Sequence, residues 1–223
     1  MAITLNDDFI SGKFYEDEYS GKWYRKQYIE TPEPLWAREA NDYYVRLFIA
    51  YTGIRPSAKI LDLGSGVGRQ IEAWRRCGFR NVKGIEISEA AIKHAGSGCE
   101  IYHGSAADMS MFEDNEFDLI SSAAFFEHID ESILDKVLSE CFRLGKRQAH
   151  TIGLERGDDP GHINIKPMEE WAIRFAEVSK RREYFVASLP DPILTETPVL
   201  VVLHGDLIPD PLWRSYERTK EAA

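Results

Sequence analysis

The stretch Ile60–Gln70 reads ILDLGSGVGRQ and places three glycines, Gly64, Gly66 and Gly68, directly after a short apolar run. Glycine loses more conformational freedom on folding than any other residue, so three in five positions need a physical reason. The apolar run is typical of a buried strand, and a helical pattern follows the last glycine. A glycine-rich turn between strand and helix lets a ligand reach main-chain N–H groups, where the helix dipole favours negative charge. An ordinary tight turn needs only one glycine, so we expect a ligand-binding loop.

Apolar runs and helical patterns alternate along the rest of the chain, which favours an α/β fold with a doubly wound, mostly parallel sheet. Seven apolar runs predict seven strands, at 59–63, 82–87, 99–103, 116–123, 147–154, 182–188 and 198–204. Helical spacing marks 36–53, 68–79, 88–96, 131–145 and 168–178. The last two runs, joined through Pro190, Pro192 and Pro198, predict a hairpin and therefore one antiparallel strand near the C-terminus.

We expect two parts in the chain. Residues 1–35 are rich in Tyr, Trp and acids without a clean period, which indicates an irregular or partly helical N-terminal aromatic arm or lid. Residues 36–223 form the ligand-binding catalytic domain, since they carry every strand and the glycine loop.

The composition limits the classes of molecule that the protein is expected to bind. The chain has 223 residues and a formal net charge of −10, which disfavours binding to a nucleic-acid backbone. The start of the chain lacks the basic and apolar blocks of a signal peptide, and no apolar run approaches the roughly 20 residues that span a bilayer. The three cysteines lack metal-ligand spacing and are expected to be reduced. We therefore expect a cytoplasmic protein without nucleic-acid or membrane partners; the oligomeric state is not indicated.

Two ligand classes use a glycine loop of this kind. A dinucleotide-binding oxidoreductase has the pattern G-x-G-x-x-G, but Arg69 follows Gly68 and leaves G-x-G-x-G. Asp62, two residues before the first glycine, is also foreign to the dinucleotide pattern. Glu86 ends the next apolar run about 20 residues on, where an acid can accept both hydroxyls of a ribose in either class.

Four motifs in this order, ILDLGSGVGRQ, GIEIS, GSAADMSMFEDNEFDLI and FFEHI, resemble the class I S-adenosylmethionine-dependent methyltransferases, and within them the type 11 group. The resemblance is best over residues 58–145. It implies a Rossmann-like methyltransferase fold that binds S-adenosyl-L-methionine and releases S-adenosyl-L-homocysteine. It leaves an NAD-type oxidoreductase, or a non-catalytic cofactor-binding module on the same fold, as alternatives.

The resemblance also implies which residues hold the cofactor. Asp62 would lie beneath it, orienting the loop or holding the amino end of the methionine moiety. Glu86 would bind the two ribose hydroxyls. The remaining implied contacts to the methionyl, ribose and adenine portions are Gly64, Ser65, Gly66, Ile87 and Ala123.

The adenine contact departs from the family pattern. Relatives usually have Gly-Asp-Ala after the third strand, whereas this chain has Gly104-Ser105-Ala106. Either Ser105, beside Ala106, replaces the missing acid, or Asp108 three residues later does so.

Two histidines are candidates for catalysis, because a hydroxyl acceptor must lose a proton as it receives the methyl group. His128 follows Glu127 after the fourth apolar run, with a structural role as its alternative. His162 lies in the loop ERGDDPGHINIKP, where Asp158 or Asp159 is expected to orient it as a base. The same loop could supply part of a divalent-metal site, which we do not expect, or form only a local turn.

The acceptor is expected to be a small polyhydroxylated molecule: a sugar, a glycan end or a secondary metabolite. The fourth run ends in SSAAFF rather than the Asn/Asp-Pro-Pro-aromatic segment of enzymes that methylate exocyclic amines of bases or glutamine amides. Aromatic residues of the arm, such as Tyr15, Tyr19 and Tyr24, are expected to fold over the cofactor, since aromatic faces attract a sulfonium cation. N- or C-methylation of another small molecule is the alternative.

Overall fold

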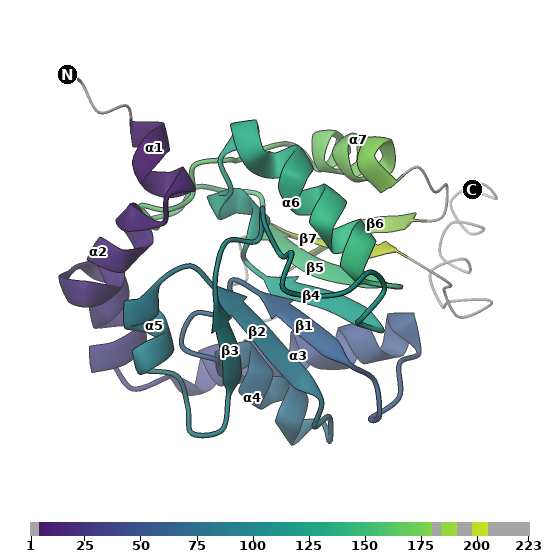
Figure 1. The fold of residues 1–223 in the computed structure, drawn as a ribbon, viewed down its shortest axis with the longest axis horizontal. Helices are drawn as coiled ribbons and strands as arrows, with labels where there is room; N and C mark the ends of the chain where they lie inside the picture. The colour runs from purple at the N-terminus through teal and green to yellow at the C-terminus, as the bar shows by residue number, and fades with distance from the viewer. Residues whose placement is uncertain (1–4, 180–183, 191–197, 205–223) are drawn as a thin grey trace.

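The computed structural model describes residues 5–179, 184–190 and 198–204. Its centre is a seven-stranded sheet in the order β3-β2-β1-β4-β5-β7-β6 (Figure 1). Five strands pair in parallel, while β7 is antiparallel to both β5 and β6. This confirms the predicted doubly wound sheet with one antiparallel strand; the predicted loop around Pro192 lies outside the described residues. The strands are β1 (Ile60–Leu63), β2 (Val82–Glu86), β3 (Glu100–His103), β4 (Leu119–Ala123), β5 (Gln148–Gly153), β6 (Tyr184–Pro190) and β7 (Pro198–His204).

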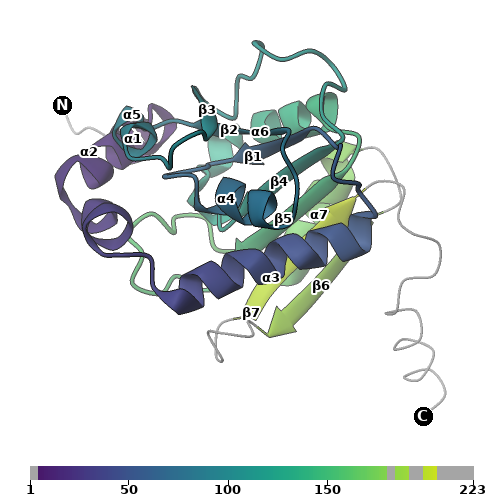
Figure 2. The ribbon, with the colours of Figure 1, turned by 90° about the horizontal axis from the view of Figure 1, so that it is seen from below.

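Helices cover both faces of this sheet. Figure 1 shows α6 (Glu131–Leu144) and α7 (Met168–Ser179) on one face, and Figure 2 shows α3 (Leu35–Thr52) and α4 (Arg69–Arg76) on the other. The chain leaves β1 for β2 on one side and returns to β4 on the other, so the strand order reverses between β1 and β4. In open α/β sheets this switch point leaves a crevice at the carboxyl ends of the strands.

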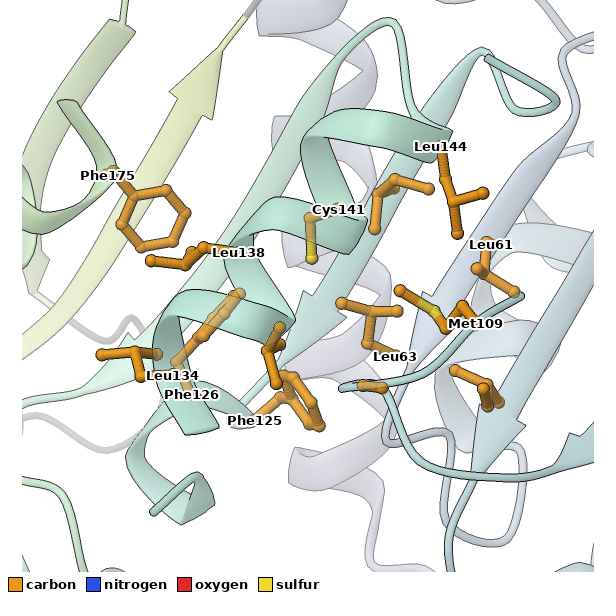
Figure 3. Packing of buried hydrophobic residues seen from close by; sticks show 14 of the residues in the cluster. Leu61, Leu63, Met109, Phe125, Phe126, Leu134, Leu138, Cys141, Leu144 and Phe175 are labelled. Atoms are coloured by element: carbon orange, nitrogen blue, oxygen red, sulfur yellow. The ribbon is translucent and has the colours of Figure 1, made fainter. Parts of the chain in front are cut away.

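Alternate residues of β1 enter two separate cores, which explains why the strand is apolar almost throughout. Leu61 and Leu63 pack with residues of α6 and α7, as Figure 3 shows. Ile60 joins the cluster built around α3 and α4. Asp62 shares the face of Ile60 and is the single acid in a strand that is buried along its whole length.

The N-terminal arm is more regular than the sequence predicts. It forms α1 (Leu5–Ile10), α2 (Lys13–Gly21) and a π-helical segment, η1 (Arg25–Glu30). Its aromatic residues, including Tyr19 and Tyr24, make a third apolar cluster against α5 (Glu89–Lys93), with Ala90 and Ala91 at its base. The long-range packing supplies the stability that short helices lack by themselves.

Polar contacts also fix α2 against the start of α5. The Glu16 carboxylate accepts hydrogen bonds from the Ser88 hydroxyl at 2.8 Å and from the Ala90 N–H at 3.0 Å. The arm therefore packs against α5, which lies between α2 and the edge strand β3 in Figure 1.

The cysteines and the helix lengths were also addressed by the sequence. The three cysteines carry free thiols, as expected. Over the described ranges, none of the helices is both long and apolar enough to cross a bilayer.

Candidate functional site

A cavity of about 470 Å³ lies between the carboxyl ends of the central strands and the N-terminal arm. Its walls come from the glycine loop, the ends of β2 and β4, the segment after β3, and the loop after β5. The arm contributes four tyrosines at near-helical spacing, Tyr15, Tyr19, Tyr24 and Tyr28. This volume is in the range of small-molecule and cofactor sites.

All three glycines of the loop have left-handed backbone conformations, with φ of +60° at Gly64, +52° at Gly66 and +85° at Gly68. A Cβ on Gly64 would meet the Phe125 ring, and one on Gly66 would lie 2.9 Å from the Tyr19 hydroxyl. Gly64 and Gly66 line the cavity. Gly68 does not; a Cβ there would meet the sulfur of Cys99, so the third glycine serves packing.

Glu86 ends β2 at the cavity wall, with 6% of its surface exposed. Its Oε2 accepts a hydrogen bond from the Gly66 N–H at 2.8 Å, and its Oε1 accepts one from the Ser88 N–H at 2.9 Å. Burial raises the pKa of this carboxyl, and the backbone donors oppose that shift. Each carboxylate oxygen has a second lone pair, so Glu86 can shape the loop and accept a diol together.

Asp62 lies behind the loop at the end of a directed hydrogen-bond chain. The Trp74 indole N–H donates to Ser121 Oγ at 3.3 Å, and the Ser121 hydroxyl donates to Asp62 Oδ1 at 3.2 Å. Burial raises the pKa of Asp62 to about 8. The hydrogen bond from Ser121 lowers this pKa, and the charge of Glu86 raises it by a smaller amount. Asp62 lines the cavity, so a bound cation would be the partner that its carboxylate lacks.

Of the other residues predicted to contact the cofactor, one fastens the loop and four line the cavity. The Ser65 hydroxyl is directed at backbone, with the Asp62 carbonyl at 3.1 Å and the Ile85 carbonyl at 3.2 Å, so its side chain fastens the loop. Ile87, Ser105, Ala106 and Ala123 line the cavity.

Asp108 lies outside the cavity lining and is exposed. Its Oδ1 accepts a hydrogen bond from the Ser110 N–H at 3.2 Å, and contacts to Ser110 lower the pKa of Asp108. Of the two alternatives for the adenine contact, only Ser105 is therefore placed at the cavity.

The structure brings His128, Asp159 and His162 together at the cavity. In the sequence, α6 and β5 separate His128 from the loop that holds Asp159 and His162. The Tyr24 hydroxyl donates to Asp159 Oδ1 at 2.7 Å and lies 3.3 Å from His128 Nδ1. The rings of His128 and His162 are 4.7 Å apart between centroids. Burial lowers the pKa of His128 to about 4, against the opposing charge of Asp159, so this imidazole is neutral at pH 7.

The orienting partner of His162 differs from the sequence expectation. His162 Nδ1 lies 3.0 Å from the carbonyl oxygen of Glu155, which can only accept, so Nδ1 carries the proton. Asp159 Oδ2 is instead 3.9 Å from His162 Nε2. Asp158 is exposed and does not line the cavity.

Sequence reasoning missed Glu127, which is fully buried and lines the cavity. Its Oε1 accepts a hydrogen bond from the Gly153 N–H at 2.8 Å, while its Oε2 has no hydrogen-bond partner among the described residues. Burial raises the pKa of Glu127 to about 8. Its signal in the sequence is an acid directly after the apolar pair Phe125 and Phe126.

The comparisons with known proteins agree with this geometry. Residues 61–152 match a family model described as "Methyltransferase domain", of type 11. Residues 61–152 thus form a methyltransferase domain of type 11, and the chain has the fold of a solved S-adenosylmethionine-dependent methyltransferase. The matched range of this methyltransferase domain runs from β1 to β5 and contains the glycine loop, Glu86 and His128. It does not contain the arm or the loop of His162.

Individual relatives of the methyltransferase domain have different activities. The chain is 29% identical over 98 residues to EEF1A lysine methyltransferase 2 of Danio rerio, which covers 42% of each protein. It is 27% identical over 215 residues to 24-methylenesterol C-methyltransferase 2 of Arabidopsis thaliana, covering 74% of this chain and 59% of the relative. The chain thus spans less than two thirds of both curated relatives.

A solved structure shows the same fold. The S-adenosylmethionine-dependent methyltransferase of Archaeoglobus fulgidus superposes with a TM-score of 0.57 at 17% identity, over 86% of this chain and 98% of that one.

The residues of the methyltransferase domain fit S-adenosylmethionine. The loop between β1 and α4 presents main chain without side chains at Gly64 and Gly66, because their conformation excludes other residues. Glu86 offers lone pairs for a ribose diol, and buried Asp62 offers a carboxylate without a cationic partner in the described residues. The dinucleotide alternative gains no such support.

Proposed function

We propose that this protein transfers a methyl group from S-adenosylmethionine to a hydroxyl of a small polyhydroxylated acceptor. The observation that carries the proposal is the polar cluster of His128, Asp159 and His162, which lines the same cavity as the glycine loop and Glu86. When bound, the cofactor supplies a methyl carbon already activated by a sulfonium, so the protein must mainly align, desolvate and deprotonate the acceptor.

The cofactor end of the cavity follows from the contacts described above. Glu86 would accept hydrogen bonds from the ribose hydroxyls, and Asp62 would face the positive charge of the methionine moiety. Gly64, Ser65 and Gly66 would border the methionyl and ribose portions. Further apolar or small contacts would come from Ile87, Ser105, Ala106 and Ala123.

The acceptor end carries groups that can take up a proton. Nδ1 of His162 faces the Glu155 carbonyl, so Nε2 is the ring nitrogen that can take up a proton, and Asp159 Oδ2 lies 3.9 Å from it. A hydroxyl placed against these atoms can lose its proton to them as it attacks, a contribution of about 10²–10⁴-fold for positioned bases.

The arm would act as the lid of this site. The Tyr15 hydroxyl donates to the backbone carbonyl of His128 at 2.8 Å, and Tyr24 donates to Asp159 at 2.7 Å. These two contacts hold the arm over the acceptor end, where it excludes water.

The test is turnover of S-adenosylmethionine with panels of sugars, polyols and phenols, run beside panels of amines and of sterols. We expect methylated oxygens as product, and we expect His162→Ala and Asp159→Asn to lower kcat at least 100-fold with unchanged affinity for S-adenosylhomocysteine. Asp158→Asn is the matched control from the same loop and should turn over normally.

Products methylated only on nitrogen or carbon would overturn the choice of acceptor. Normal turnover by His162→Ala would remove that residue from the mechanism. Binding of S-adenosylhomocysteine without turnover on any panel would favour a non-catalytic module.

A further inference from the structure

Beside the polar cluster lies a group that a simple base does not need. This group is the buried carboxyl of Glu127, next to the imidazoles of His128 and His162. One ligand atom from each of Glu127, His128 and His162 lies within 4.8 Å of the others. Glu127 is fully buried, lines the cavity and leaves Oε2 without a hydrogen-bond partner in the described part of the chain. A buried carboxyl oxygen without a hydrogen-bond partner is costly even when the group is neutral, so its retention here indicates a ligand in the cavity.

The backbone brings these three side chains together. The Glu127 carbonyl accepts hydrogen bonds from the N–H groups of Ile163 at 3.0 Å and Asn164 at 2.9 Å. The loop that follows β5 is thereby fastened to the residue next to His128. Two main-chain bonds that place His162 beside Glu127 make a built site rather than a chance cluster of surface groups.

Hydrogen bonds also select the ring tautomers. The Tyr24 hydroxyl donates to Asp159, so its oxygen can accept from Nδ1–H of His128 at 3.3 Å. Nδ1 of His162 faces the carbonyl of Glu155 at 3.0 Å and must also be protonated. In both rings Nε2 is then the nitrogen left to bind a ligand, and oriented rings of this kind are typical of metal-binding histidines.

Small residues make room for the cluster. A Cβ on Gly153 would lie 2.8 Å from Glu127 Oε1 and 3.6 Å from His162 Cε1, and a Cβ on Gly161 would lie 2.7 Å from His128 Nδ1. Both positions are therefore closed to larger residues while Glu127 and the histidines keep their places.

We propose that Glu127, His128 and His162 bind one divalent transition-metal ion, such as Mn²⁺ or Zn²⁺, in the wall of the cavity. Two imidazole nitrogens and one carboxylate oxygen suit these ions better than Mg²⁺ or Ca²⁺, which prefer oxygen ligands. This departs from the sequence-based expectation that no metal takes part, and its ligand set differs from the Asp158–Asp159–His162 alternative.

The ion deepens the proposed function, on which its catalytic role rests. Three protein ligands leave coordination positions open for oxygens of a hydroxylated acceptor. Coordination lowers the pKa of a bound hydroxyl. With the ion bound, His162 is a ligand and Asp159 alone would serve as the base. The hydroxyl O–H bond would then break with its proton passing to Asp159, while the oxygen forms the new bond to the methyl carbon and the bond from sulfur to that carbon breaks.

The test is direct binding of Mn²⁺ to the chelator-treated full chain, without cofactor or acceptor, by electron paramagnetic resonance and calorimetry. Zn²⁺ should compete for the same site, and Mg²⁺ should not. We expect one Mn²⁺ per chain, and at least a 100-fold loss of affinity in Glu127→Gln and in His162→Ala. Loss of an outer-sphere partner alone costs about 10–100-fold, which is the expectation for Tyr24→Phe.

His94→Ala is the control, because His94 is exposed at the end of α5. It should bind Mn²⁺ like the parent chain, and S-adenosylhomocysteine binding by every variant verifies folding. Absence of Mn²⁺ and Zn²⁺ binding by the folded parent chain overturns the inference, as does binding that survives both substitutions.

These results are independent of the proposed function. Turnover on hydroxylated acceptors without metal binding would refute only the metal site, whereas metal binding without turnover would refute only the activity.

Discussion

Replacing Gly66 with alanine separates two consequences of the glycine loop, backbone strain and lost ligand space. Gly66 has φ of +52°, and a left-handed conformation costs a residue with a Cβ about 1–2 kcal/mol. At about 2–4 °C per kcal/mol for a chain of this size, the melting temperature should fall by about 2–8 °C.

The new methyl group would also change the cavity wall. It would lie 2.9 Å from the Tyr19 hydroxyl, too close for an unstrained contact, so either the arm or the loop must move. Because both residues line the cavity, we expect S-adenosylhomocysteine to bind at least tenfold more weakly, which corresponds to about 1.4 kcal/mol. Isothermal titration calorimetry measures this directly.

Gly78→Ala is the matched control. Gly78 also has a left-handed φ, +93°, but an added Cβ meets nothing within 4 Å, and the residue does not line the cavity. It should lose comparable stability and keep full cofactor affinity. Tyr19→Phe combined with Gly66→Ala removes the crowded oxygen and should recover part of the affinity. Equal affinity of the Gly66 and Gly78 variants would refute the argument that the loop is bare in order to admit a ligand.

Four further predictions concern the cavity and the core. Since the pKa of Asp62 is about 8, its carboxyl is protonated in the free protein at pH 7. Binding of cationic S-adenosylmethionine should therefore release a proton. Calorimetry would show this release as a binding heat that depends on the buffer, and Asp62→Asn should abolish that dependence. The same raised pKa means that its contribution to folding stability is full below about pH 4 and lost as the pH rises through 8, so Asp62→Asn should flatten the pH dependence of unfolding. Glu86→Ala should be less stable than Glu86→Gln by about 1–3 kcal/mol, because the single amide oxygen of Gln can still accept from one of the N–H groups of Gly66 and Ser88, and an equal stability by urea unfolding would contradict this. Phe126→Ala, in the core of Figure 3, should cost about 3–5 kcal/mol of unfolding free energy, and a loss below 1 kcal/mol would argue against the packing described.

Features that depend on local sequence were predictable. The strands are short apolar runs bounded by turns, and the strand-end acid Glu86 follows the glycine loop at a fixed spacing. Their positions are set by neighbours in the chain or by adjacent strands, so the pattern carries the information.

Features that depend on distant partners were not predictable. The sequence left Ser105 and Asp108 equivalent, and only the turn in which Asp108 meets Ser110 removes the second. The sequence left the arm as irregular or partly helical, because its helices are stabilised by contacts with α5 rather than by their own period. Likewise, nothing near His162 in sequence shows that Glu127 lies beside it.

The way the arm is fastened has a consequence for how the chain folds. Tyr15 is separated from His128 by 113 positions, and Tyr24 from Asp159 by 135. At a synthesis rate of about 5–20 residues per second, the arm waits about 7–27 seconds for the partner of Tyr24 to be made. During that interval its aromatic side chains have no finished sheet to cover. The segment that closes the cavity is therefore synthesised before the strands and loops that form the opposite wall.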